Sequence, residues 1–418
     1  MIGHLRNSYN ESWELVNWKL LQKTLFRLQH RVWKAVRNGD KAKARNLQKL
    51  IFNSYAARML AIRQVTQLNQ GKKTAGVDGK KSLTDKERFQ LEEELKENSK
   101  NWKHQSLREI PIPKKDGTTR MLKVPTIADR AWQCLAKYAL EPAHEATFHE
   151  RSYGFRPGRS THDAQKHLYN NLNSRVKGIN KQVLEIDIEK CFDRISHSTI
   201  LEKIIAPKSI KTGVWRCLKA GINPQFPVQG TPQGGVVSPL LANIALNGIE
   251  RIGEFKGKDK IRGICVRYAD DMVYVLRPQD DAQEILRKIE EFLDKRGMNV
   301  SQKKTKLTAP TEGFDFLGWH FKVQNNGKFR CTPSEGNYKS FKQKVKNIVN
   351  NSNYGADVKV AKLAPIIRGW RNYHKYCKMD GSRFSLWHLA YRTFQVFLKQ
   401  KSLDRRQLPR AQGDVACN

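Results

Sequence analysis

The chain has 418 residues, of which 39% are hydrophobic and 28% charged, and its 77 Lys and Arg against 40 Asp and Glu give a formal net charge of +37. This composition is typical of a folded protein of two or three domains and excludes wholesale disorder. Solubility of a small domain requires a net charge of magnitude about 2 to 8. The much larger positive excess therefore indicates a polyanionic partner, and we infer a nucleic acid.

Targeting signals and paired cysteines are not evident. No stretch approaches about 18 uninterrupted apolar residues, so no membrane span is expected. The opening MIGHLRNSYNESW has no apolar core, and a secretory signal is therefore not expected. The seven cysteines are scattered and never form a C-x-x-C pair, which fits reduced thiols and gives no zinc site.

Residues 11–69 are predicted to be helical, because apolar residues recur at intervals of three or four. The basic turn RNGDKAKAR (37–45) separates two helical stretches, and a glycine-rich loop follows at 71–80. Thr84 and Glu87 then have the spacing of a capping box for the next helix. The apolar stripe of the first helix consists of Trp18, Leu21, Leu25, Leu28, Val32 and Val36.

From about residue 106 the pattern changes to short strands and turns. Residues 107–125 (LREIPIPKKDGTTRMLKVP) predict a hairpin with a Lys-Asp-Gly turn. Residues 182–188 (QVLEIDI) predict a strand, and 263–276 (GICVRYADDMVYVL) predict strand, turn and strand. A helix follows, with Gly297 where a C-terminal cap belongs. Helices combined with antiparallel hairpins favour an α+β fold over a doubly wound sheet.

Beyond about residue 335 the helical period returns among many lysines and arginines. We therefore divide the chain into residues 1–92, 93–335 and 336–418. The apolar face of the last region contains Leu363, Ile366, Ile367, Trp370, Tyr373 and Cys377.

Two adjacent acids, Asp270 and Asp271, lie between two runs of strand-forming residues in this basic chain. An Asp pair alone is an ordinary turn signal, but Asp187 ends a second apolar strand. Carboxylates from neighbouring strand ends can converge, and hard oxygen ligands in a polyanion-binding protein suit Mg²⁺. Two such ions about 4 Å apart can hold both oxygens of an in-line phosphoryl transfer, with a nucleoside triphosphate as substrate.

Ordered sequence blocks now add a family resemblance. Tyr268-Ala269-Asp270-Asp271 resembles the Y-x-D-D box of reverse transcriptases, and Asp187 with Phe192 resembles their first aspartate motif. The chain is most similar to the bacterial and organellar group II intron reverse transcriptase/maturases, whose order its blocks follow. These blocks are TAGVDG (74–79), IPIPKKDGTTRMLKVPTIADRA (110–131), SYGFRPGRSTHDA (152–164), TPQGGVVSPLLANIAL (231–246), GMNVSQKKTKL (297–307), GFDFLGW (313–319) and IIRGWRNYHKY (366–376).

The resemblance implies an α+β right-hand polymerase. Residues 1–92 would be a helical N-terminal extension, 93–335 the fingers and palm, and 336–418 a helical thumb that is also the maturase-specific domain. Its catalytic metal-binding residues would be Asp187, Asp270 and Asp271. They would hold two Mg²⁺ ions, with Mn²⁺ as an alternative ion.

The resemblance also implies substrate contacts. Phe192 would lie at the sugar, where an aromatic ring leaves no room for the 2′-hydroxyl of a ribonucleotide. Lys114 and Arg120 would hold the incoming triphosphate, and Gln233 would lie beside the nascent base pair. In the thumb, Trp370 and Tyr373 belong to the apolar face, so the RNA contacts expected there are Arg368, Arg371 and Lys375.

The implied function is RNA-directed DNA polymerisation together with binding of a group II intron RNA, which assists splicing and mobility. The expected partners are intron RNA, an RNA template with a DNA primer, deoxynucleoside triphosphates and target DNA, in the bacterial cytoplasm or an organellar matrix or stroma. No oligomeric state is implied. The C-terminal residues have no paired cysteines or clustered histidines, so no H-N-H nuclease is expected.

Two alternatives remain open. One is a splicing maturase without polymerase activity, against which the presence of all three aspartates argues. The other is a related reverse transcriptase recruited to defence or spacer acquisition, against which the RGWRNYHKY segment (368–376) argues.

Overall fold

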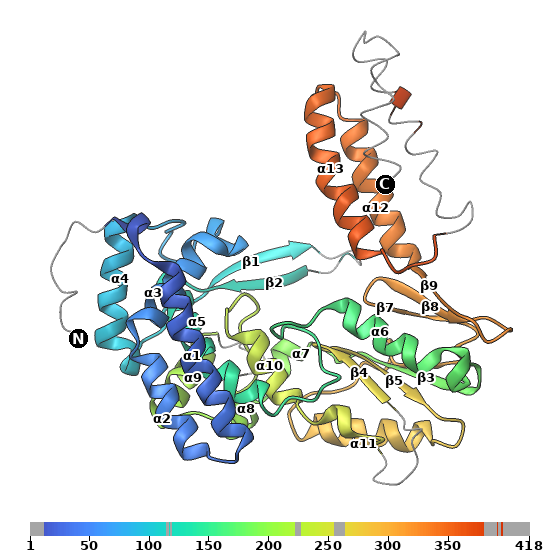
Figure 1. The fold of residues 1–418 in the computed structure, drawn as a ribbon, viewed down its shortest axis with the longest axis horizontal. Coiled ribbons are helices and arrows are strands. Elements are labelled where there is room, and N and C mark those ends of the chain that lie inside the picture. Colours follow the sequence, from blue (N-terminus) through green and yellow to red (C-terminus); the bar gives the residue numbers. More distant parts are fainter. Residues whose placement is uncertain are drawn as a thin grey trace. The chain divides into compact units, whose positions relative to one another are not determined.

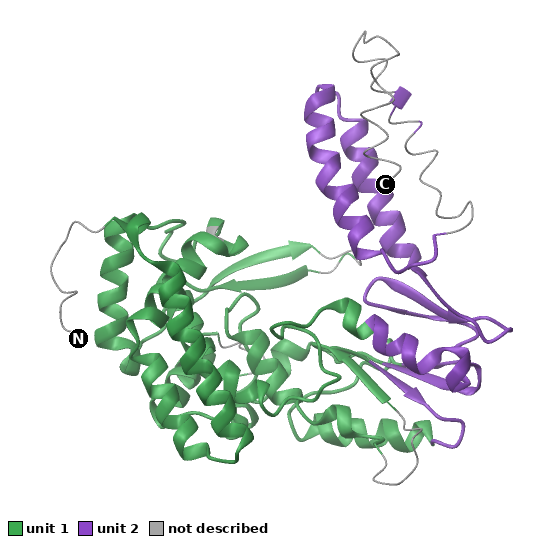
Figure 2. Cartoon of the chain, in the orientation of Figure 1, with its two compact units in different colours: residues 1–164, 186–272, 281–305 green, residues 165–185, 273–280, 306–418 purple. Residues whose placement is uncertain are grey.

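The computed structural model (Figure 1) describes residues 12–113, 117, 119–221, 227–254, 264–379, 391 and 394–395. The chain divides into two compact units (Figure 2). Unit 1 comprises residues 1–164, 186–272 and 281–305, and unit 2 comprises residues 165–185, 273–280 and 306–418. Both units contain helices and strands, which agrees with the predicted α+β class. The predicted boundaries near 92 and 335 stay predictions.

Unit 1 begins with a group of helices. Of these, α5 packs against α1, α2 and α3, and its side chains Trp132 and Leu135 are completely buried. The predicted stripe of α1 is confirmed at three of its six positions, Leu25, Val32 and Val36, which are buried. The helices are α1 (Trp18–Arg37), α2 (Lys41–Phe52), α3 (Tyr55–Arg63), α4 (Asp85–Asn98) and α5 (Ile127–Glu145).

The start of α4 shows the predicted capping box. The Thr84 side chain accepts from the backbone N–H of Glu87 at 3.3 Å, and the Glu87 carboxylate accepts from the backbone N–H of Thr84 at 2.8 Å. Two of the four backbone donors that a helix start leaves without helical partners are thus satisfied by side chains. The glycine-rich loop before α4 includes a short 3-10 helix, Gln70–Lys73.

His144, near the end of α5, is a buried neutral histidine. Its side chain is 3% exposed, and its Nε2 accepts a hydrogen bond from the backbone N–H of Ile205 at 3.2 Å. Burial, with a smaller contribution from Lys211, lowers the pKa of His144 from 6.5 to about 3. This histidine therefore stays uncharged in the folded protein over the ordinary pH range.

Acidification is expected to destabilise the fold through His144. Below pH 6.5 the unfolded chain binds a proton at this residue, whereas the folded chain does so only near pH 3. One pH unit below the unfolded pKa, the loss is about 1.4 kcal/mol in the free energy of unfolding. Denaturant titrations between pH 7.5 and 5.5 measure it.

The variant His144→Gln should lose that part of the pH dependence. The matched control is His30→Gln, which removes a solvent-exposed histidine of α1. Equal pH slopes in the wild type and in His144→Gln would contradict the expectation.

The predicted hairpin is confirmed by the pairing of β1 (Arg108–Pro113) with β2 (Thr119–Val124). The strands are antiparallel, and Ile112 lies opposite Arg120. Of the turn between them, Gly117 is described, and it has a φ of 80°.

A four-stranded sheet follows, with strand order β4-β5-β3-β6. Its strands are β3 (Gln182–Ile186), β4 (Ile264–Tyr268), β5 (Asp271–Leu276) and β6 (Lys306–Thr308). Both strand predictions, at 182–188 and at 263–276, are thereby confirmed apart from their exact ends. The accompanying helices are α6 (Thr161–Leu172), α7 (Cys191–Arg194), α8 (His197–Lys203), α9 (Lys208–Ala220), α10 (Ser238–Leu246) and α11 (Ala282–Asp294).

Unit 2 contains a three-stranded antiparallel sheet and a pair of helices. The strands are β7 (Phe314–Phe316), β8 (Trp319–Val323) and β9 (Phe329–Pro333), and the helices are α12 (Glu335–Val349) and α13 (Ala356–Tyr373). Trp370 stacks on Phe341 with ring centroids 4.4 Å apart. Tyr373 stacks on Trp319 at 4.6 Å and donates to the carbonyl of Leu317. Trp370 and Tyr373 therefore belong to the packed face, as predicted.

The six cysteines in the described part of the chain are free thiols, as the sequence predicts. Cys331 and Cys377 lie with their sulfur atoms 3.6 Å apart, without a disulfide bond. None of the described helices is long and apolar enough to cross a membrane.

Candidate active site

The turn between β4 and β5 consists of Ala269 and Asp270, and Asp271 is the first residue of β5. The strands on both sides are buried, from Cys265 to Arg267 and from Met272 to Leu276. Ala269 has a φ of 60°, a left-handed conformation that is uncommon for a residue with a side chain. The apolar hairpin thus has a left-handed residue in its turn, with Asp270 in the turn and Asp271 directly after it. We refer to residues 269–271 as the acid-bearing turn.

Gly154 supports this turn from outside the hairpin. A Cβ atom at position 154 would lie 2.4 Å from the backbone nitrogen of Ala269 and 2.9 Å from the carbonyl carbon of Tyr268. Only a residue without a side chain allows so close an approach between two backbones. This close approach explains why position 154, the first glycine of the SYGFRPG block (152–158), is a glycine.

Asp187 comes directly after β3, and its side chain is half-buried. Its backbone carbonyl accepts from the N–H of Ser301 at 2.8 Å. One of its carboxylate oxygens lies 3.2 Å from Nζ of Lys304, whose side chain is 70% exposed. A lysine therefore neutralises one member of the predicted acidic set in this structure.

The three aspartates lie close enough together that the charge of Asp187 affects the ionisation of Asp270 and Asp271. Burial and, to a smaller extent, the charge of Asp187 raise the pKa of Asp270, whereas Arg120 and Arg267 oppose that rise. Asp271 is in contact with solvent, but the surrounding protein desolvates its carboxylate. This desolvation, with the charges of Asp270 and Asp187, raises the pKa of Asp271 to about 6. The arrangement therefore holds negative charge at a cost that a cation would relieve.

The donor set fits divalent cations in its chemistry. Three carboxylates offer the hard oxygen ligands that Mg²⁺ prefers, and they repel one another without a cation between them. In the described ranges, no three or more His, Cys, Asp or Glu side chains lie close enough together to hold a metal ion as they stand. The ion pair of Lys304 with Asp187 would have to give way when a cation enters.

Gln233 connects two charged residues beside this acidic set. Its Nε2 donates to both carboxylate oxygens of Asp193 at 3.2 Å, and its Oε1 accepts from Nε of Arg120. Its backbone carbonyl accepts from the N–H of Lys123 in β2 at 2.9 Å. The structure thus brings together two of the predicted substrate-binding residues, Arg120 and Gln233. Another of the four, Lys114, lies outside the described residues, and Phe192 is described below.

Phe192 lies on the short helix α7, five positions after Asp187, and is half-buried. Its carbonyl accepts from the N–H of Thr231 at 2.7 Å, which joins α7 to the loop that carries Gln233. In that loop Gly234 has a φ of 134°, and a Cβ there would lie 2.7 Å from the carbonyl oxygen of Lys123. Hydrogen bonding therefore joins the loop to α7, and close backbone approach joins it to the β1–β2 hairpin.

The predicted RNA-binding residues belong to unit 2. Arg368 lies on the exposed side of α13, Arg371 is half-buried, and Lys375 follows the helix and is exposed. Lys375 lies over the ring of Tyr376 at 4.8 Å. Cationic groups next to an exposed aromatic ring are able to contact phosphates and bases of RNA.

Three contacts near the acidic set were not predicted from the sequence. The Asp193 carboxylate holds the amide of Gln233, and no sequence pattern indicates this contact. Within residues 303–306, Lys304 pairs with Asp187 and Lys306 with Glu185. Arg267 is a charged residue inside an apolar strand, which is a usable signal because such a residue needs internal partners.

Three protein-family descriptions match the chain. They are "N-terminal domain of reverse transcriptase" over residues 13–95, "Reverse transcriptase (RNA-dependent DNA polymerase)" over residues 112–321 and "Group II intron, maturase-specific domain" over residues 338–410. The fold is therefore that of a reverse transcriptase, and the acid-bearing turn lies within the residues that match the polymerase description.

Relatives agree with these matches. Maturase-like protein 1 of Euglena gracilis is 40% identical over 389 residues, which cover 93% of this chain and 82% of that protein. Maturase-like protein 1 of Euglena longa is 35% identical, covering 93% and 84%. The group II intron-encoded protein LtrA of Lactococcus lactis subsp. cremoris is 28% identical, covering 54% and 48%. The chain belongs to the group II intron reverse transcriptase/maturase family.

Proposed function

We propose that the chain is an RNA-directed DNA polymerase that also binds a group II intron RNA and assists its splicing and mobility. The observation that carries the proposal is the gathering of Asp187, Asp270 and Asp271 in a basic protein, where the charge of Asp187 raises the pKa of Asp270 and the charges of both raise the pKa of Asp271. A structural role does not explain the three carboxylates, because bringing like charges together destabilises a fold even where one of them, Asp187, pairs with a lysine.

The roles of the remaining residues follow from their contacts. Asp187, Asp270 and Asp271 would hold Mg²⁺ or Mn²⁺, which supplies charge stabilisation in phosphoryl transfer. Arg120 would bind the triphosphate by forked hydrogen bonds, and Lys114 would add a second cation. Asp193 orients the Gln233 amide, and through it the position of Arg120.

RNA binding would involve the thumb residues Arg368, Arg371 and Lys375 of the proposed domain 336–418. No ion pair joins Arg368 or Arg371 to a side chain within the described ranges. Their guanidinium groups would therefore bind phosphates of the intron RNA without first breaking such a pair. Intron RNA, primed RNA template, deoxynucleoside triphosphates and target DNA are the proposed partners, in a bacterial cytoplasm or an organelle.

A splicing maturase that does not polymerise is a second candidate, favoured by the name "maturase-like" of the two Euglena relatives. The complete set of three aspartates argues against it. A related reverse transcriptase recruited to defence or spacer acquisition would be recognised by its genomic neighbourhood, where a flanking intron ribozyme would be missing.

Single-nucleotide incorporation tests the proposal. The purified chain, a DNA primer on an RNA template, Mg²⁺ and each deoxynucleoside triphosphate in turn should give extension only with the nucleotide complementary to the template. Intron splicing with no templated extension in Mg²⁺ or Mn²⁺ would favour the maturase without polymerase activity.

Replacing Phe192 by alanine is expected to weaken sugar selection. Without the ring, a 2′-hydroxyl no longer meets a steric barrier, and the preference for deoxyribonucleotides should fall about tenfold or more. Competing incorporation of matched ribo- and deoxyribonucleotides measures the preference. The control is Phe89→Ala on α4. Phe89 is half-buried, and the centroid of its ring lies 5.4 Å from that of Trp13. An unchanged ratio in Phe192→Ala would assign that ring to packing alone.

A further inference from the structure

Arg267 lies in β4, three residues before Asp270, and is completely buried. Its neighbours in the strand, Cys265 and Val266, are buried apolar residues. Moving an arginine from water into such surroundings costs several kcal/mol unless its donors are satisfied and its charge is paired. The partners of this guanidinium therefore indicate why the residue is present.

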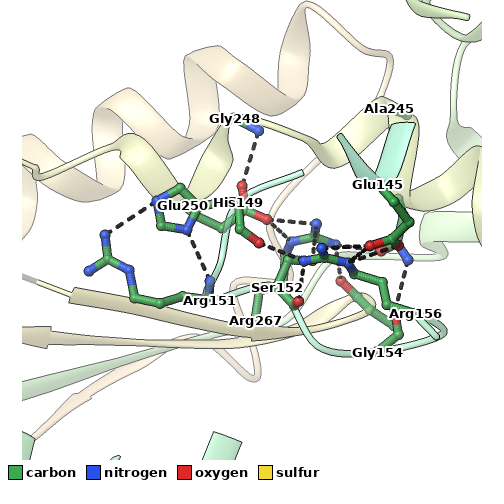
Figure 3. Close-up of polar contacts among 12 residues, drawn as sticks. Glu145, His149, Arg151, Ser152, Gly154, Arg156, Ala245, Gly248, Glu250 and Arg267 are labelled. Carbon is green, nitrogen blue, oxygen red and sulfur yellow. Dashed lines mark hydrogen bonds and ion pairs between the residues drawn. The ribbon is translucent and has the colours of Figure 1, made fainter. Parts of the chain in front are cut away.

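Four segments supply those partners, and Figure 3 labels two of the partners, Glu250 and Ser152, around Arg267. Nε and Nη2 both lie 2.6 Å from Oε1 of Glu250, which is also completely buried. Nη2 donates to Oγ of Ser152 at 2.7 Å. Nη1 donates to Oδ1 of Asn243 at 2.9 Å and to the backbone carbonyl of Ala269 at 2.8 Å.

The pair with Glu250 makes the buried charge tolerable. Burial alone would raise the pKa of Glu250, but Arg267 and backbone hydrogen bonds hold it below its usual range. The ionised pair is neutral as a whole, so the guanidinium keeps its remaining donors for neutral acceptors. One of those acceptors is the carbonyl of Ala269, the left-handed residue of the acid-bearing turn.

The same contacts enclose the turn from a second direction. Asn243 accepts from Arg267 and donates to the carbonyl of Gly154 at 2.8 Å. Gly154 in turn touches the backbone of Ala269. The segment before it runs beside β4, because the N–H of Arg267 donates to Arg151 and the N–H of Tyr153 donates to Arg267. The left-handed peptide is thus held between Arg267, Asn243 and Gly154.

We infer that Arg267 is a positioning residue, whose guanidinium fixes the Ala269–Asp270 peptide and thereby the direction of the Asp270 and Asp271 carboxylates. This role in catalysis rests on the proposed polymerase function. A lysine would keep the charge opposite Glu250 but not the planar fork that reaches four acceptors at once. The inference therefore predicts that charge alone is not sufficient at position 267.

The experiment compares Arg267→Lys with the matched control Arg58→Lys. Arg58 is a buried arginine of the same unit that pairs with buried Glu92 at 2.7 Å and donates to the carbonyl of Asn53. Both variants keep a positive charge and lose a buried fork. They should therefore lose similar thermal stability and differ only in their effect on the turn.

The readouts are the kcat and KM of single-nucleotide incorporation and the hydrogen exchange of a peptide covering residues 266–272 without substrate. In Arg267→Lys, kcat should fall about 100-fold, as expected for a misplacement of catalytic groups by about 1 Å. The KM values for primer-template and nucleotide should stay within about twofold, since neither contacts Arg267 in this account. Exchange at 266–272 should become faster. Arg58→Lys should leave kcat and this exchange unchanged.

Gly154→Ala tests the turn from its other side and serves where Arg267→Lys does not fold. Its control is Gly213→Ala, whose Cβ would lie 2.2 Å from the Trp132 ring. Gly154→Ala should reduce kcat by at least as large a factor as it changes either KM value. Gly213→Ala should reduce thermal stability and leave kcat unchanged.

Equal kcat values in Arg267→Lys and Arg58→Lys, or unchanged exchange at 266–272 in Arg267→Lys and Gly154→Ala, would overturn the inference. The exchange measurement needs no catalysis. A wild type that fails to extend primers would contradict the proposed function, whereas faster exchange in Arg267→Lys would still show that this residue holds the turn.

Discussion

Replacing Asp270 by asparagine is expected to reduce primer extension on an RNA template by about three orders of magnitude. A bound cation contributes several kcal/mol to stabilisation of the developing charge, and each 1.4 kcal/mol corresponds to about a tenfold change in rate. Asparagine has nearly the same shape but is a much weaker ligand for Mg²⁺. Single-turnover extension with saturating enzyme measures the effect.

The fold should not suffer from this substitution. Burial and the neighbouring Asp187 disfavour the charged form of Asp270, so a neutral amide should leave the thermal unfolding temperature unchanged or higher. The control is Asp294→Asn at the exposed end of α11, which removes the same charge from the surface. Near-normal extension by Asp270→Asn would contradict the assignment of the acidic set, and a loss of extension in both variants would point to a general charge effect.

Replacing Arg368 and Arg371 together by alanine is expected to weaken intron RNA binding about a hundredfold. A charged hydrogen bond contributes about 1.5 to 3 kcal/mol, and two such contacts at the lower value correspond to that factor. Because α13 buries Trp370 and Leu363 instead of the two arginines, the fold should be retained. Filter binding and splicing at limiting protein concentration measure the effect.

A loss of two positive charges also weakens RNA binding nonspecifically. The matched control is Arg287→Ala/Lys288→Ala on α11, which removes two exposed cations that pair with Glu284. It should lower affinity much less than the α13 variant. Equal losses in the two double variants would show that α13 contributes only to overall charge.

Local patterns predicted several elements of the secondary structure, including the hairpin that carries the two adjacent acids. The capping box at Thr84, the β1–β2 hairpin and the strand–turn–strand at 263–276 depend on residues that are close in sequence. Each is determined by backbone hydrogen bonding and side-chain periodicity over a few residues. Such signals can be read without knowledge of the tertiary fold.

The contacts that orient the candidate site could not be predicted in this way. Arg267 meets Ser152, Asn243 and Glu250, which lie 115, 24 and 17 positions away in the sequence. Gln233 meets Asp193, 40 positions away. Which side chains converge depends on the packing of whole elements, so a single sequence shows that Arg267 needs acceptors but not which residues supply them.

The family resemblance supplied what local patterns could not. It assigned roles to Asp187, Asp270 and Asp271 together, and the structure shows that the charge of Asp187 affects the pKa of both other residues. The roles of all the site residues stay predictions, and Lys114 also lies outside the described residues.

The central claim is that one chain has two activities that depend on different residues. Splicing is the chemistry of the ribozyme itself, so the protein has only to hold the RNA in its active shape. The most direct measurement is the splicing rate of the intron with limiting Asp270→Asn protein, relative to wild type. We predict that splicing is unchanged in this variant although its primer extension is lost. A parallel loss of splicing in a correctly folded Asp270→Asn protein would contradict the claim.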